Sequence, residues 1–116
     1  KHEQINGDLI IESSNAASVD LTLLEAINGS LIVRNNDRLT RLRLKALKRV
    51  QGDIIISNNP LLESLVDLKR VERVGGNFHV CDNSALPATH PLKIRDMIMD
   101  AAGIGGDVTI TDNKGF

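Results

Sequence analysis

The chain has 116 residues, a formal net charge of −1 at pH 7, two Phe and neither Trp nor Tyr. This length predicts one domain, residues 1–116, with an aliphatic core that needs no metal or disulfide framework. The scarcity of aromatic rings argues against stacking platforms for single-stranded nucleic acid, and the balanced charge argues against nucleic acid as a partner in general.

The cysteine and histidine content indicates no metal centre or internal disulfide. Cys81 is the single cysteine, so the redox compartment stays open. His2, His79 and His90 have no metal-ligand spacing. The printed sequence contains no signal peptide, no lipidation motif and no apolar run long enough to cross a bilayer. We therefore expect no cofactor and no membrane insertion.

A short pattern led by glycine occurs five times along the chain. The aligned glycines lie 22, 23, 24 and 30 residues apart, at Gly7, Gly29, Gly52, Gly76 and Gly106. A period near 23 residues is typical of a solenoid, in which each coil buries its apolar edge only against its neighbours. The repeat therefore predicts a stack of about five coils.

Each copy also predicts a strand. The residues two and four places after each glycine are apolar: Leu9 and Ile11, Leu31 and Val33, Ile54 and Ile56, Phe78 and Val80, Val108 and Ile110. A period of two is that of a strand with these side chains facing inward. We predict a mainly β fold, a parallel β-solenoid with one strand per coil in a single sheet, right-handed by the crossover rule.

A column of small polar residues follows the strands, three places after the second inward residue. Its members are Ser14, Asn36, Asn59, Asn83 and Asn113. Asparagine amides can bond the turn backbone of adjacent coils. We interpret the column as a structural ladder.

The segments between the strands are rich in leucine. LTRLRLKALKRV, residues 39–50, has an apolar residue every two or three positions, which suits short extended or 3₁₀ segments that turn corners. The last interval is longer and predicts a helix over 91–102, with Thr89 as its cap and Gly103 as its end. We expect Met97 and Met99 to act as packing filler.

The unit N-x-x-L-x-x-L followed by V-x-G-D-I-x-I-x-x-N resembles the receptor L domain, the solenoid related to leucine-rich repeats in growth-factor and insulin receptor ectodomains. The resemblance covers nearly the whole chain, and the closing stretch NSALPATHPLKIRDMIMDAAGIGGDVTITDN is similar to that of microbial surface members. It implies a non-catalytic recognition or adhesion module, extracellular or at the cell surface, within a larger surface protein.

The outward positions of the predicted sheet suggest a binding face. The column three places after each glycine reads Ile10, Ile32, Ile55, His79 and Thr109. A contiguous apolar patch usually marks an interaction site. We expect Ile10, Ile32, Ile55 and His79, flanked by Arg34 and Asp53, to bind a protein or glycan. Alternatives are the simple β propensity of exposed isoleucine, or cover by another domain or a second copy.

Two residue pairs are candidates for catalytic groups. Asp8 and Asp53 lie two coils apart, roughly 10 Å, which is near the upper limit for an inverting glycosidase, and no aromatic sugar platform accompanies them. His79 and Cys81 point outward side by side, as a surface thiol and a base, but no third group orients the histidine. We therefore predict that the protein is not an enzyme.

A basic run without acids offers a second surface, a possible anion-binding flank. Its members are Arg38, Arg41, Arg43, Lys45, Lys48 and Arg49. The flank would attract acidic polysaccharide, lipid headgroups or an acidic partner, and the alternative is a solvated convex side. Asn28-Gly29-Ser30 is a glycosylation sequon.

Two other function classes remain open at this point. The chain can act as a structural subunit that forms homo-oligomers through its unpaired sheet edges, residues 1–11 and 108–111. It can also be a polysaccharide-acting β-helix enzyme, which would need a deeper cleft.

Overall fold

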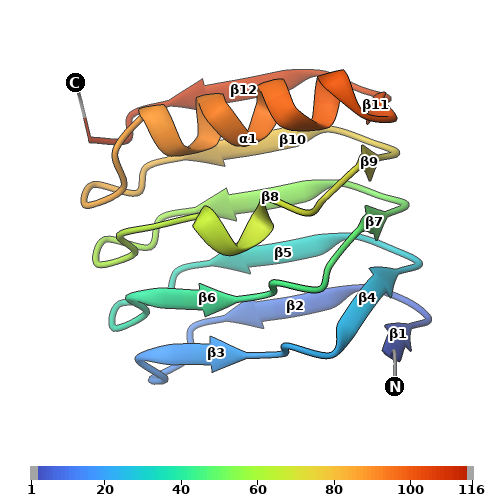
Figure 1. The fold of residues 1–116 in the computed structure, drawn as a ribbon. Helices are drawn as coiled ribbons and strands as arrows, with labels where there is room; N and C mark the ends of the chain where they lie inside the picture. Colours follow the sequence, from blue (N-terminus) through green and yellow to red (C-terminus); the bar gives the residue numbers. More distant parts are fainter. Residues whose placement is uncertain (1–2, 115–116) are drawn as a thin grey trace.

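The computed structural model describes residues 3–114 and shows a stack of parallel strands (Figure 1). Sheet 1 has the order β12-β10-β8-β5-β2, and every neighbouring pair is parallel. Its strands are β2 (Leu9–Glu12), β5 (Leu31–Arg34), β8 (Ile54–Ser57), β10 (Phe78–Cys81) and β12 (Val108–Thr111). The strands predicted from the glycine repeat are therefore confirmed.

The five glycine-led strands form one sheet, as predicted, but the prediction of one strand per coil was wrong, because the corner segments also pair. Sheet 2 has the order β1-β4-β7-β9-β11, and sheet 3 joins β3 to β6. Their bounds are β1 (Glu3–Ile5), β3 (Ser18–Asp20), β4 (Leu24–Ile27), β6 (Arg41–Arg43), β7 (Arg49–Val50), β9 (Arg73–Val74) and β11 (Gly103–Ile104). Stacking brings the neighbouring strands of these two sheets to one strand spacing from each other, so their backbone groups bond there too.

The third side of the coil changes character along the stack. Sheet 3 occupies it in the first coils, the 3₁₀ helix η1 (Val66–Leu68) follows, and α1 (Thr89–Asp100) comes last. Figure 1 shows these elements one above another. The chain makes about three turns of ordinary length before the longer segment that contains α1. Five coils was an overestimate, because five stacked strands enclose only four intervals, three of ordinary length and the longer one that contains α1.

The core is aliphatic and lies inside the coil. The inward residues of β5, β8 and β10 are completely buried, as are corner residues such as Leu44, Leu47 and Leu62. In the two terminal strands the inward residues Leu9 and Val108 are only partly buried, because each has a neighbouring coil on one side alone. Burial of this apolar surface is the main stabilising term.

The glycine column has a steric reason. A Cβ on Gly76 would collide with Asp53 Oδ1, and one on Gly52 would collide with Ser30 Oγ. The same side chains accept hydrogen bonds from the next coil: Asp53 Oδ1 from the Asn77 N–H at 2.7 Å, and Ser30 Oγ from the Asp53 N–H at 3.0 Å. Glycine thus leaves room for a ladder of turn bonds, which we call the turn ladder.

The two residues that follow each strand of sheet 1 form a turn. The first adopts a left-handed conformation, with φ between 53° and 58°, at Ser13, Asn35, Asn58, Asp82 and Asp112. Asn and Asp tolerate this conformation better than most residues with a side chain. The second residue is the member of the polar column, whose side chain is thereby directed into the coil.

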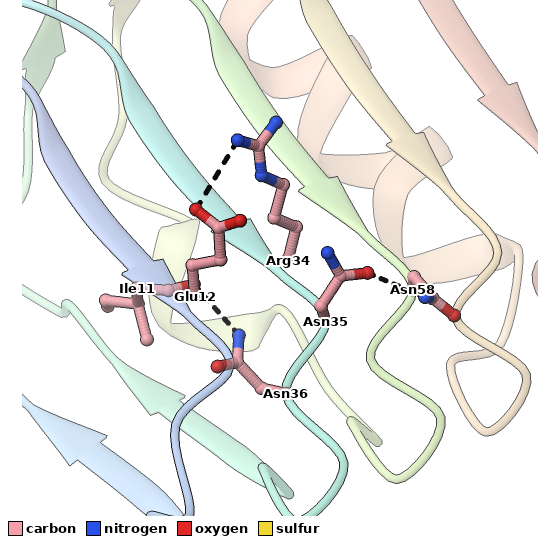
Figure 2. Close-up of polar contacts among 6 residues, drawn as sticks. All are labelled: Ile11, Glu12, Arg34, Asn35, Asn36 and Asn58. Carbon is pink, nitrogen blue, oxygen red and sulfur yellow. Dashed lines mark hydrogen bonds and ion pairs between the residues drawn. The ribbon is translucent and has the colours of Figure 1, made fainter.

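The asparagines of this column form a buried ladder. Asn59 Oδ1 accepts from the Asn36 N–H at 3.3 Å and from its Nδ2 at 2.9 Å. Asn59 Nδ2 donates to the Val33 carbonyl at 3.1 Å and to Asn83 Oδ1 at 3.0 Å. Figure 2 shows the equivalent bond of the preceding coil, from Asn36 Nδ2 to the Ile11 carbonyl at 3.0 Å. Asn36, Asn59 and Asn83 are completely buried.

The helix differs from its prediction at both ends. It spans Thr89–Asp100 rather than 91–102, so Thr89 is the first helical residue and Ala88 is the N-cap, without a side-chain cap bond. The helix ends at Asp100 with Ala101 as its C-cap, so Gly103, with φ 94°, is not the stop residue but begins β11. Met97 and Met99 are 37% and 55% exposed, so the filler interpretation was wrong; the helix buries Ile94 and Ile98 instead.

We expect Asn59→Ala to destabilise the protein by about 3 kcal/mol, because it leaves several buried polar groups without partners. Urea unfolding followed by circular dichroism measures the change. The control is Asn15→Ala, at an exposed residue of the loop after β2, with an expected change below about 0.5 kcal/mol. Equal effects of the two substitutions would contradict a structural role of the ladder.

Candidate recognition surface

The outer face of sheet 1 carries a column of side chains in register. Ile10 pairs with Ile32, Ile32 with Ile55, Ile55 with His79, and His79 with Thr109. Ile10 is 53% exposed, and the other four are partly exposed. Alternation along each strand points these side chains away from the core. The structure therefore brings the three isoleucines of the predicted face together with His79.

One end of this column is hollowed. Ile55, Asn77, His79, Asp107 and Thr109 line a shallow depression of about 240 Å³. Asp107 is exposed and directly precedes the last strand, β12, beyond which the described chain provides no further coil of the turn ladder. The depression combines an apolar wall with an imidazole and a carboxylate.

A polar column borders the isoleucines. Arg34 donates to Glu12 Oε2 at 3.4 Å across the β2–β5 pair, as Figure 2 shows. Both side chains are exposed, so the ion pair adds little stability. It gives the apolar column a charged rim.

Cys81 belongs to the same border but is buried, at 8% exposure, so the expected surface thiol was wrong. Its Sγ lies 2.8 Å from His79 Nε2. Burial raises the pKa of the thiol to about 11, assisted by a hydrogen bond to Asp82 and by the charges of Asp82 and Asp112. The neutral thiol is a poor nucleophile, which argues against a His79–Cys81 catalytic pair.

The carboxylates of Asp8 and Asp53, which were candidates for catalysis, accept hydrogen bonds from turn backbone instead. Asp8 Oδ1 accepts the Ser30 N–H at 2.8 Å, and Asp53 Oδ1 accepts that of Asn77. Asp53, expected beside the isoleucines as a partner-binding residue, is half-buried and occupied by this bond. It is a member of the turn ladder.

The basic run is divided between two sides of the coil. Arg41 and Arg43 lie in sheet 3, whereas Arg49 lies in sheet 2. Arg38, Arg41, Arg43, Lys45 and Arg49 are exposed, and Lys48 is half-buried.

Acidic residues of adjacent coils lie beside this run. Asp20 is in register with Arg43. The Lys48 N–H donates to the Glu25 carbonyl, and the Lys48 carbonyl accepts from the Glu72 N–H. The run therefore does not form one continuous basic flank.

Sequence reasoning missed a wider groove on another side. It lies between η1 and α1, has a volume of about 620 Å³, and includes Val66 and Met97 among its lining residues. Apolar residues on the exposed side of the helix pointed to such a groove, but the sequence did not show how the helix packs against η1.

Two features are absent from the part of the chain that the structure describes, a cluster of metal ligands and a helix that could cross a membrane. Within residues 3–114, no group of three or more His, Cys, Asp or Glu side chains is placed to hold a metal ion. His2 lies outside the described residues. No described helix is both long enough and apolar enough to span a bilayer.

Strands stacked around an internal asparagine ladder, with one open sheet face, define a parallel β-solenoid of about three turns with one helix. The family model of the Receptor L domain matches residues 3–116, so the chain belongs to that family. Membership indicates a ligand-recognition module. No solved structure matches the chain.

We expect alkylation of Cys81 by iodoacetamide to be slow at pH 8, because a pKa raised to about 11 leaves the thiolate scarce. The thiolate fraction should be roughly 100-fold below that of a thiol at the ordinary value of 9.0. The rate should rise with pH towards a midpoint near 11. Asp82→Asn should lower that midpoint by removing a negative charge; rapid labelling at pH 8 would contradict burial of the thiol.

Proposed function

We propose that the protein is a non-catalytic recognition or adhesion module that acts outside the cell or at its surface. In this proposal the outer face of sheet 1 binds a partner. Membership of the Receptor L domain family supports the recognition role and the extracellular placement.

The observation that carries the proposal is the in-register stack of Ile10, Ile32 and Ile55 on an outward face. These isoleucine side chains point away from the core. The solvent-facing side of a sheet ordinarily carries polar side chains. Three such residues in neighbouring strands make a contiguous apolar strip. Contiguous exposed strips of this kind mark interaction sites.

The contrast between columns strengthens this argument. The turn ladder and the asparagine ladder are held by hydrogen bonds between coils, so their residue types are constrained by the fold. The isoleucine column is constrained by neither ladder. Cross-strand contacts between isoleucines add some stability to the sheet, and a partner surface accounts for apolar side chains that stay exposed to solvent in the free chain.

The chemistry of the face favours a protein partner over a glycan. An apolar centre with a charged rim, here Glu12 and Arg34, is the usual arrangement of a protein interface. His79 and the depression beside it can receive one projecting side chain. Glycan sites generally add an aromatic platform, and the chain has no Trp or Tyr.

We expect Ile32→Asp to weaken binding of a protein partner at least tenfold, because it places a charge at the centre of the apolar strip. A panel of secreted and cell-surface proteins, with a glycan array in parallel, identifies binders of the wild-type chain. Titration of each binder by surface plasmon resonance then compares wild type with the variant.

The matched control is Leu61→Asp, at an exposed leucine outside sheet 1, which should leave binding unchanged. Circular dichroism checks that both variants fold. Light scattering of the same samples separates partner capture from self-association through the sheet edges. A binder with equal affinity for wild type and Ile32→Asp would place the contact elsewhere and contradict the proposal.

A further inference from the structure

The elements η1 and α1 lie on the third side of the coil (Figure 1). The groove between them is not lined by the outward residues of sheet 1. Its floor and walls combine the buried residues Leu65 and Ile94 with Val66 and Met97, which are 49% and 37% exposed. Two short elements thus leave four apolar side chains facing one hollow.

The groove exists because the third side of the coil changes from strand to helix. In the earlier coils β3 and β6 stack at strand spacing. A helix is wider than a strand and cannot approach its neighbour as closely, so α1 contacts η1 but leaves a channel between them, which Ile94 helps to line. The hollow is therefore a consequence of this change of element.

His90 joins the two walls and directs a donor to the groove. Its Nδ1 accepts a hydrogen bond from the Leu65 N–H at 3.3 Å. An acceptor Nδ1 places the proton of the neutral ring on Nε2. His90 also lines the groove, and in this tautomer Nε2–H is the donor of its ring.

The charged groups of the groove are cationic. Lys69 follows η1 and Lys93 lies on α1, so an ammonium group comes from each wall. No Asp or Glu lines the groove among the described residues. On the same helix, Asp96 pairs with Arg95 at 2.7 Å. An apolar channel with two ammonium groups and an imidazole donor is complementary to an amphiphile with an anionic head.

We propose that this groove binds an aliphatic carboxylate. The alkyl chain lies along Leu65, Val66, Ile94 and Met97, and the carboxylate is held by Lys69, Lys93 and the Nε2–H of His90. A volume of about 620 Å³, with a mostly apolar lining and few polar groups, has the character of a small-molecule site. The proposal does not depend on the recognition role of sheet 1.

Other ligand classes fit the groove less well. A peptide added as a strand needs an open sheet edge, and the two elements that form the walls are helical. A sugar would lack the aromatic platform. A cationic amphiphile would meet like charges from Lys69 and Lys93.

Methionine methyl resonances provide the test, because the chain has two methionines and one of them lines the groove. The protein is labelled with 13C at the methionine methyl groups and titrated with dodecanoate below its micelle concentration. We expect a saturable shift of the Met97 methyl resonance and little change at Met99, which is 55% exposed and does not line the groove. Dodecyltrimethylammonium should bind at least tenfold more weakly.

Charge reversal locates the headgroup. Lys69→Glu with Lys93→Glu should weaken dodecanoate binding at least tenfold, whereas Lys114→Glu, at an exposed lysine that does not line the groove, should not change it. Amide spectra of the folded variants serve as the folding control. Equal shifts of both methyl resonances, equal affinity for the cationic amphiphile, or no effect of the double reversal would each overturn the proposal.

Discussion

The interaction on which the structure depends is the stacking of coils one strand spacing apart, with polar groups bonded from coil to coil inside the stack. The completely buried asparagines provide the clearest case, since each amide bonds both the next asparagine and a strand carbonyl. A shift of one coil by a single residue would leave these amides unpaired and turn the inward side chains outward. The register is thereby specified more sharply than apolar packing alone would specify it.

This constraint divides the surface into residues that the fold needs and residues that it does not. The carboxylate of Asp53 is occupied by the turn ladder, although its position beside the isoleucines suggested a binding role. Ile10, Ile32 and Ile55 take part in neither ladder, and they lie in register on the outer face of sheet 1. The groove between η1 and α1 is likewise outside both ladders. Rigid coils thus present two independent surfaces with different chemistry, one a shallow apolar strip and the other a cationic channel.

The features that repeat were predictable from the sequence, and those that occur once were not. Glycine spacing and the inward pairs located all the strands of sheet 1, because each copy supports the same interpretation. Pairing of the corner segments into sheet 2 was missed, since β7 and β9 are only two residues long and have no period of their own. Alternation placed Cys81 correctly on the outer side, but its burial depends on neighbouring side chains. The groove depends on how α1 packs against η1, which periodicity does not determine.

Hydrogen exchange of individual backbone amides, followed by NMR, tests most directly whether the buried ladder locks the register. The N–H groups of Asn36, Asn59 and Asn83 donate to side-chain oxygens of the next coil at 3.1 to 3.3 Å, outside any strand pairing. The account predicts that these amides exchange as slowly as those of β5 and β8. Exchange as fast as that of the exposed turn residues Asp37 and Arg38 would contradict it.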